Sequence, residues 1–405
     1  MATTAIWRWE LSVFKRLIPL TVAAFAVGTN TLVIAGLLPA IAQSLQVSVS
    51  AAGQLVTGFA LTYAIAAPVV SALTGSMDRR TVLLGALSVF VVGNVMVAVA
   101  GTYPIALAGR LVSAIGSAVI VSLSLATATA IAPAHKRARA LAVVTAGLTV
   151  ATTLGVPLGT LIGGVNWRIT LWAVAGLGVL AAIGIAVALP QVELPATSLR
   201  ERLAPLRSPV VLGILGITAL MLSSGYTVYT YIGPVTAPAT GGEASRLTLV
   251  LVCYGLGSLL GNIVSGFLTD SYPPVRVLLT GQTVVTVTMA VTVLATQSMI
   301  SVLLWAIIWG LAGWLNGLPQ QHRLVAHAPQ ASAVLLGLNV AVLQLGVAIG
   351  SGLGGIILPH GVGVLAAVSA GMMALALVVT IFTTRRRRTA EAVHQPGVPA
   401  LDQRS

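Results

Sequence analysis

One arginine stands inside a long apolar stretch of this sequence, and no carboxylate shares that environment with it. Arg110 lies in the apolar run that begins near Tyr103, and a rise of about 1.5 Å per helical residue places it roughly 10 Å into a membrane. Ionisable residues at such depth usually face polar cavities and act on solutes, ions or protons. The alternative is an arginine that only ties helix ends together through backbone carbonyls.

The acidic residues fall in the polar segments between the apolar runs. They are Glu10, Asp78, Glu193, Glu201, Glu243, Asp270, Glu391 and Asp402. A transporter that exchanges protons needs a group that takes up a proton on one side and releases it on the other, usually Asp or Glu. Composition therefore opposes proton exchange through a buried carboxylate. A loop acid, a protonated solute or uncoupled transport remain as alternatives.

Neutral polar and aromatic residues in the middle of the apolar runs are the candidates for solute contact. Together with Arg110 they are Asn30, Thr31, Tyr63, Tyr226, Tyr229, Trp309, Asn316, Asn339 and Gln344. Amides, hydroxyls and rings suit an uncharged or amphiphilic solute, and they offer nothing to hold a strong cation. Plain helix packing is the alternative for each of them.

The chain lacks the residue groups of an enzyme. No His, Cys, Asp or Glu cluster has catalytic or metal-ligand spacing, and Cys253 is the single cysteine. No Gly-rich loop with a lysine is present to bind nucleotide phosphates. We expect no enzymatic activity, no metal and no cofactor.

Composition and hydropathy indicate a multi-pass membrane protein, because 57% hydrophobic and 7% charged residues cannot make a polar surface. A membrane-spanning helix needs about 20 apolar residues. Twelve stretches qualify: 17–42, 51–75, 81–100, 104–131, 139–164, 167–189, 209–236, 245–269, 275–296, 298–320, 331–357 and 361–384.

The basic residues alternate with these stretches and predict the topology. Eighteen of the 21 Lys and Arg fall at the termini or in every second gap, whereas Arg168 and Arg246 fall in the other gaps. Cytoplasmic loops carry such an excess, so both termini are predicted to be cytoplasmic. Contact with anionic lipid headgroups explains the net charge of +13 better than a nucleic-acid partner does.

The long polar segment 191–208 divides the twelve stretches into two predicted bundles of six. The expected organisation is an N-terminal segment 1–16, a bundle 17–190, a central cytoplasmic loop 191–208, a second bundle 209–384, and a basic, then disordered tail 385–405. Two parallel halves of this kind, with a solute site between them, are one known architecture of secondary transporters.

Several short motifs carry a family resemblance over most of the chain. They are Gly36 to Ala42, Asp78 to Leu84, Arg110 with Gly116, Gly147 to Ala151, Gly155 to Gly159, Trp167-Arg168, Tyr229 to Pro234, and Gly337 to Asn339. In this order they resemble the major facilitator superfamily, and within it the bacterial drug:proton antiporters that include arabinose-efflux-type permeases. The resemblance implies an all-α fold of twelve transmembrane helices in two six-helix halves.

The resemblance also implies roles for several residues. Gly147, Gly155, Pro157 and Gly159 match an exporter motif, in which glycines let helices pack closely and proline lets one bend. Arg79 and Arg80 with Gly266 and Asp270 match two copies of a cytoplasmic latch, and Arg110 matches an arginine linked to proton coupling. Thr31 stands where many relatives have an acid, which puts that coupling in doubt.

The sequence therefore predicts a monomeric transporter in a bacterial cytoplasmic (inner) membrane that exports a small neutral or amphiphilic solute, such as a drug, sugar or nucleoside. Exchange for protons, uncoupled facilitation, uptake by the same fold and a non-transporting sensor remain alternatives.

Overall fold

The computed structural model describes residues 2–133, 136–191 and 203–394, and these form helices joined by short turns. The first half contains α1 (Ala2–Ser44), α2 (Val49–Leu73), α3 (Arg79–Ala98), α4 (Tyr103–Ile131), α5 (Arg137–Val150), the π-helical turn η2 (Ala151–Gly155) and α6 (Val156–Ala188). The second half contains η3 (Ala204–Arg207), α8 (Pro209–Tyr229), α9 (Ile232–Thr240), α10 (Ala244–Ser271), α11 (Pro274–Ala290), α12 (Thr292–Ala295), α13 (Met299–Leu315), α14 (Gly317–His327), η4 (Pro329–Ala331), α15 (Ser332–Ile357), η5 (Leu358–His360) and α16 (Val362–His394).

Polar residues mark where several helices begin. Side chains of Ser48, Asp78, Ser208 and Ser298 accept a hydrogen bond from the backbone N–H three residues later. Such caps satisfy amide groups that have no partner in the first helical turn. The apolar runs between the caps form helices because hydrocarbon offers no other partner to backbone N–H and C=O groups.

Within the described residues, ten helices are long and apolar enough to cross a membrane. One of these covers Arg137–Ala188, and its 52 residues would measure about 78 Å if straight, far more than a bilayer core of about 30 Å. The helix is interrupted at Asn166, where φ is −157° and ψ is 113°. The Thr170 hydroxyl donates to the Gly159 carbonyl at 2.7 Å, which requires that the chain folds back between them.

Helix α11 is a second place where the structure differs from the twelve predicted stretches. It has 17 residues and is continued, after a break at Val291, by the four residues of α12. The predicted stretch 209–236 is also divided, because α8 ends at Tyr229 and α9 begins at Ile232. The number of crossings therefore stays a prediction.

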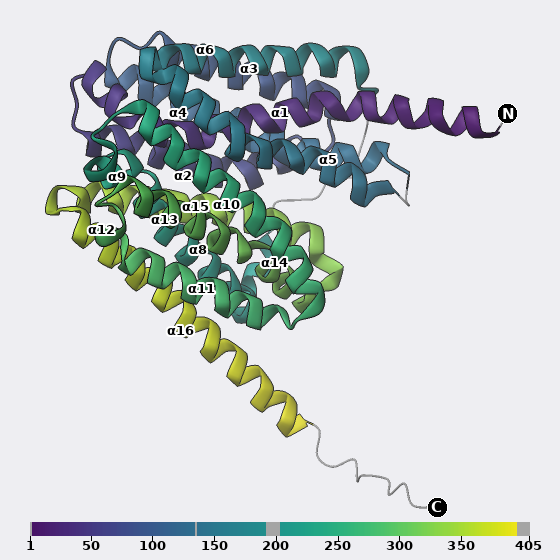
Figure 1. The fold of residues 1–405 in the computed structure, drawn as a ribbon. Coiled ribbons are helices and arrows are strands. Elements are labelled where there is room, and N and C mark those ends of the chain that lie inside the picture. The colour runs from purple at the N-terminus through teal and green to yellow at the C-terminus, as the bar shows by residue number, and fades with distance from the viewer. Residues whose placement is uncertain (1, 134–135, 192–202, 395–405) are drawn as a thin grey trace, which may run out of the picture.

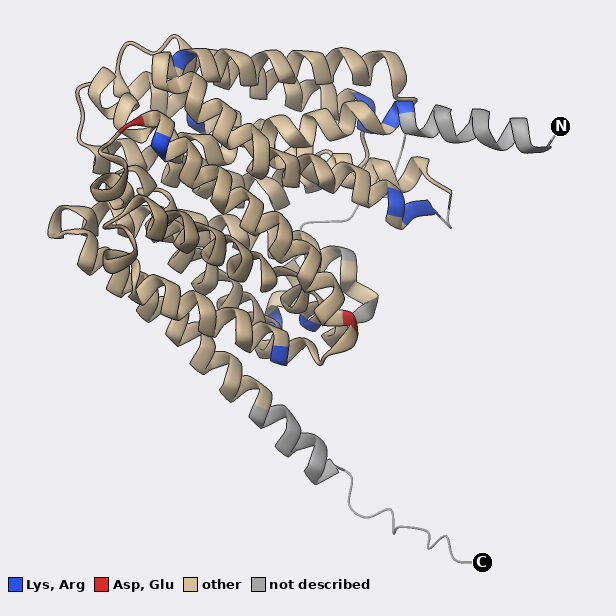
Figure 2. Ribbon diagram, viewed as in Figure 1, with Lys and Arg blue, Asp and Glu red and all other residues tan. Residues whose placement is uncertain are grey.

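The helices gather in two groups that meet along one side (Figure 1). Helices α1 to α6 lie together, and α8 to α16 form the second group, while α1 and α16 both extend from the same end of the molecule. We call this end the basic end, because it holds the α2–α3, α4–α5 and α10–α11 turns with Arg79, Arg80, Lys136, Arg137 and Arg276 (Figure 2).

The opposite end holds the α1–α2, α3–α4 and α9–α10 turns, and there the two groups share one apolar core. Buried members of this core include Leu38, Leu55 and Trp167 from the first group and Ile232 and Leu247 from the second. The other two apolar cores each draw their buried members from one group alone. We call this opposite end the sealed end.

Close backbone contact holds α3 against α4. A Cβ atom on Gly93 would lie 2.7 Å from the Ser113 Cα and from the Gly109 carbonyl oxygen, and one on Gly116 would lie 2.7 Å from the Phe90 nitrogen. Small residues at such crossings let membrane helices approach closely.

We predict that Gly93→Val destabilises the protein by about 2 kcal/mol or more, because the added side chain has only backbone to displace. Gly85→Val is the matched control on the same helix, since a Cβ there meets nothing within 4 Å. Thermal unfolding of the two variants in detergent checks this. Equal midpoints would contradict the packing described for α3 and α4.

Candidate functional site

Arg110 of α4 is fully buried and contacts neutral groups of two other helices, α1 and α2. Its Nη1 donates to the Asn30 side-chain oxygen at 2.9 Å and to the Asn30 carbonyl at 3.2 Å, and its Nε donates to the Leu55 carbonyl at 3.5 Å. The guanidinium carbon lies 4.1 Å from the centre of the Phe59 ring, a cation–π distance. The structure thus brings the predicted Asn30 and Arg110 into direct contact.

Two donors beside this contact have no hydrogen-bond partner among the described residues. They are Nη2 of Arg110 and Nδ2 of Asn30, and both atoms are buried. Tyr63 belongs to the same region, because its ring centre lies 6.2 Å from that of Phe59. Thr31 uses its hydroxyl within its own helix, donating to the Val27 carbonyl at 2.8 Å.

An aromatic cluster occupies the second half of the chain. Ring centres lie 5.5 Å apart for Tyr226 and Tyr229, 5.1 Å for Tyr229 and Tyr254, and 4.8 Å for Tyr254 and Trp309. Trp305 extends the cluster at 4.9 Å from Trp309. Three predicted residues are therefore joined by Tyr254 and Trp305, which the sequence analysis missed. Trp305 lies four residues before Trp309 on α13, a spacing that could have indicated their contact, whereas Tyr254 lies on α10 and its contact carried no sequence signal.

The predicted amides of the second half are held in other places. Asn316 donates to the Ala312 carbonyl at 2.9 Å and lies over Gly281 of α11, where a Cβ would come within 2.9 Å of its Cγ. The Asn339 oxygen accepts from Thr218 at 3.4 Å, and Gln320 donates to the same hydroxyl at 3.2 Å. Gln344 is partly buried on α15. These contacts are those of helix packing.

The two groups of helices meet along α2 with α15 and along η2 with α10. We call this contact between the groups the seam. Thr57 and Ser351 hydroxyls lie 3.0 Å apart across the first contact. Across the second, the Thr153 hydroxyl lies 3.4 Å from the Gly255 carbonyl, and a Cβ on Gly255 would lie 2.8 Å from the Thr153 Cα. The π-helical turn η2 thus forms part of the seam, and such turns are often found at functional sites.

The glycine and proline motif extends from α5 through η2 into α6 and faces α1. A Cβ on Gly147 or Gly155 would come within 3.2 Å of Phe25, and one on Gly159 within 2.6 Å of Val33. Pro157 is the second residue after the π-helical turn and has no N–H to donate. The motif therefore packs α5, η2 and α6 on α1, while Thr153 of the same turn contacts α10.

Tyr231 fills the seam near the sealed end. It lies between α8 and α9, is fully buried, and donates its hydroxyl to the Ser351 carbonyl at 2.9 Å. Its ring packs on Gly53 of α2, and a Cβ on Gly354 or Gly355 of α15 would come within 2.6 Å of it. Sequence reasoning missed this residue, because only the three glycines on two distant helices reveal the space for the ring.

The predicted latch residues bind within their own halves. Arg79 donates to the Gly75 carbonyl at 2.8 Å and to the Thr74 carbonyl at 3.3 Å, and Arg80 donates to the Ala186 carbonyl. Asp270 lies within the last turn of α10 and not, as the sequence analysis expected, in a loop; its side chain is exposed. Around Gly266 an added Cβ would meet nothing within 4 Å.

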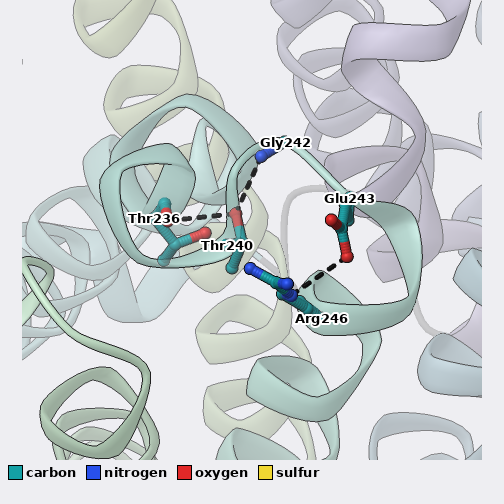
Figure 3. Close-up of polar contacts among 5 residues, drawn as sticks. All are labelled: Thr236, Thr240, Gly242, Glu243 and Arg246. Atoms are coloured by element: carbon teal, nitrogen blue, oxygen red, sulfur yellow. Dashed lines mark hydrogen bonds and ion pairs between the residues drawn. The ribbon is translucent and has the colours of Figure 1, made fainter.

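Charged residues at the sealed end also tie helix ends together. Arg168 donates to the Ser44 hydroxyl at 2.9 Å and to the Ala100 carbonyl at 2.7 Å, and it stacks on the Trp167 ring at 4.4 Å. Glu243 and Arg246 form an exposed ion pair at 3.0 Å (Figure 3). The Glu243 carboxylate is thereby compensated at the surface.

Comparison with known proteins agrees with this architecture. The family model described as Major Facilitator Superfamily matches residues 20–237 and 214–401. An uncharacterized MFS-type transporter, YbcL of Bacillus subtilis (strain 168), is 35% identical over 340 residues, covering 83% of this chain and 87% of its own length. The chloramphenicol resistance protein of Streptomyces lividans is 33% identical over 378 residues, 90% and 96% of the two chains.

A solved structure has the same fold. The xylose transporter XylE from E. coli, in a partially occluded inward open conformation, superposes with a TM-score of 0.72 over 90% of this chain and 96% of its own at 16% identity.

We predict that Tyr231→Ala opens the sealed end more often, because the variant loses a buried ring that joins the two groups. The reporter is Leu251→Cys in a Cys253→Ala background, since Leu251 is buried against Gly36 of α1. Its modification by a membrane-impermeant maleimide should be at least about 10-fold faster with Tyr231→Ala, as loss of a buried aromatic side chain costs about 3 kcal/mol or more.

Tyr231→Phe is the control, because it keeps the ring and loses one hydrogen bond. Equal modification rates for the three proteins would show that Tyr231 does not hold this end closed.

Proposed function

The chain belongs to the Major Facilitator Superfamily, and from this membership we propose that it exports a small neutral or amphiphilic solute across a bacterial cytoplasmic membrane. It is an integral, multi-pass membrane protein, and its relatives and fold are those of transporters, which are not enzymes. Both curated relatives described above are bacterial, which supports the proposed membrane.

The proposed topology has twelve crossings in two bundles of six, with both termini in the cytoplasm. The return of the chain between Gly159 and Thr170 supports counting Arg137–Ala188 as two crossings. Helix α12 continues α11 directly after Val291, which supports counting the two together as one crossing. With these two additions the ten long helices become twelve, and the basic end is the cytoplasmic one.

The observation that carries the proposal is the unequal packing of the two ends. One apolar core joins the bundles at the sealed end, whereas the other two cores belong to single bundles. A carrier that is closed to the outside and open to the cytoplasm has this arrangement, and rocking about the seam would reverse it. A seam made of few hydrogen bonds and many small residues supports the proposal of alternating access.

The solute is proposed to bind between the Arg110 contact and the aromatic cluster. Rings of Tyr226, Tyr229, Tyr254 and Trp309 offer apolar faces with hydroxyl groups at their edges, and the Tyr229 hydroxyl has no partner among the described residues. Such surfaces suit a planar, amphiphilic molecule. The name of the chloramphenicol resistance relative supports an aromatic drug as one candidate.

The proposal includes exchange of the solute for protons. Glu243 is paired with Arg246 at the sealed end, and Asp270 stands at the basic end. Neither is positioned in the middle of the protein, so coupling through them would require a long path. Uncoupled efflux or uptake by the same fold is the alternative, and a sensor without transport is the third.

We propose that the latch forms only in the opposite conformation. In the present one Arg79 and Arg80 bind carbonyls at the ends of α2 and α6. When the basic ends of the two bundles approach, these arginines come near Asp270 of α10. A partly wet charge pair is worth about 1 kcal/mol, which would change the ratio of two conformations several-fold.

We predict that proteoliposomes containing the purified protein move chloramphenicol faster than protein-free vesicles do. Trp309→Leu should slow this flux at least about 5-fold, because it removes the centre of the aromatic cluster while keeping an apolar side chain. The measurement is repeated with and without a pH gradient. A gradient that leaves the rate unchanged would exclude proton exchange for this solute.

The panel should also include sugars and nucleosides, since the proposal names a chemical class and not one compound. Absence of flux for every member would remove the transport proposal and favour the sensor.

We predict that Asp270→Asn lowers the transport rate several-fold, because the conformation closed at the basic end loses its charge pair. Glu243→Gln is the matched control, since this carboxylate lies at the sealed end and is exposed. Rates from initial solute flux decide the question. Unchanged flux in Asp270→Asn would rule out the latch.

A further inference from the structure

The charge of Arg110 is not balanced by its surroundings. Its side chain is fully buried, and its recorded partners are two carbonyls, one amide oxygen and one aromatic ring, all of them neutral. Buried charges in proteins are ordinarily paired with an opposite charge. The carboxylates whose side chains the structure describes, those of Asp78, Glu243 and Asp270, stand at helix ends near the two surfaces.

The two polar groups without a partner at this contact are hydrogen-bond donors. Nη2 of Arg110 and Nδ2 of Asn30 are buried, have no partner among the described residues, and belong to side chains that are already hydrogen-bonded to each other at 2.9 Å. A ligand that completes this pair must therefore accept hydrogen bonds. Because the pair carries a positive charge, an acceptor with a negative charge satisfies it better than a neutral one.

We propose that Arg110 and Asn30 form the anchor for an organic anion, so that the solute is an amphiphile with a carboxylate or sulfonate at one end. This inference rests on the proposed transport function and narrows its solute class. The planar guanidinium and the amide N–H match the two oxygens of such a group. The apolar body of the solute would lie against the aromatic cluster of the second half, which contains no formal charge.

The two sites occupy related positions in the two halves of the chain. Phe59 and Tyr254 are separated by 195 positions, and so are Arg110 and Trp305. Where the first half has a cation on an aromatic ring, the second half has only rings. Helices related in this way face each other across the central axis of a two-bundle transporter, so the cationic wall and the aromatic wall would enclose one solute.

If the solute is an anion, the membrane potential can drive its export without a buried carboxylate. Each exported anion moves one negative charge out of a cell whose interior is negative. This is worth about 2.3 kcal/mol per 100 mV, or roughly a 50-fold concentration ratio. Export is electrogenic in this direction whether or not a proton enters in exchange.

The test uses two probes that differ in charge but share their ring and sulfonyl oxygens, benzenesulfonate and benzenesulfonamide. Binding to the purified full chain is measured by calorimetry in chloride-free detergent solution. We expect benzenesulfonate to bind at least about 10-fold more tightly than the amide, as is usual for charge-assisted hydrogen bonds. Equal affinities, or binding of neither probe, would overturn the proposed anchor.

Arg110→Gln should abolish the preference for the sulfonate while changing the affinity for the amide less than about 3-fold. Arg110→Lys should keep part of the preference, because it keeps the charge and loses the planar geometry. Arg168→Gln is the matched control: this arginine also binds a carbonyl and an aromatic ring, but at the sealed end. A sulfonate preference that survives in Arg110→Gln would overturn the proposal.

Should Arg110→Gln fail to fold, the wild-type comparison of the two probes still decides, and so does the response to voltage. Efflux of benzenesulfonate from proteoliposomes should accelerate when a potassium gradient with valinomycin makes the lumen negative. Flux that ignores the potential would contradict anion export. Chloramphenicol flux in the same vesicles distinguishes failure of the anion anchor from failure of the proposed transport function. If chloramphenicol flux persists without sulfonate binding, the transport function stands and the anion anchor does not.

Discussion

The absence of water in the membrane interior is the constraint on which the whole structure depends. It forces the backbone into helices, and it places nearly every charged side chain at a helix end, where arginines such as Arg79 and Arg168 bind carbonyls. Arg110 is the buried arginine that does not follow this pattern. A charge kept at that depth among neutral acceptors has a cost, and we propose that a role in moving solute accounts for its presence.

The same medium explains how the two groups of helices can move. In lipid there is no hydrophobic driving force for two apolar helix faces to associate. The seam therefore depends on close packing and on a few hydrogen bonds. Tyr231 and the glycines around it supply the packing near the sealed end, and Thr57 with Ser351 supplies one hydrogen bond. A contact of this kind can be exchanged for another at the basic end without exposing much backbone.

The sequence predicted what periodicity and residue type determine, and missed what only contact determines. Apolar length located the helices, the rarity of a buried arginine identified Arg110, and Asn30 was chosen separately as a polar residue in the middle of an apolar run. The return at Asn166 was predicted as a gap between two stretches, and the helix is interrupted at that residue. Tyr231 and Tyr254 could not be found, because their partners lie on helices distant in the chain, whereas Trp305 could have been found from its spacing of four to Trp309. Asn316 and Asn339 were chosen by type, and their partners are those of helix packing.

The central claim is that this protein works by closing one end of the seam as the other opens. Paired spin labels in a Cys253→Ala background measure this directly, at Arg137 and Arg276 for the basic end and at Gly101 and Ser245 for the sealed end, all of them exposed positions. On adding a transported solute, distances at the basic end should shorten in the same fraction of molecules in which those at the sealed end lengthen. Distances that stay fixed, or that change in the same direction at both ends, would contradict the account.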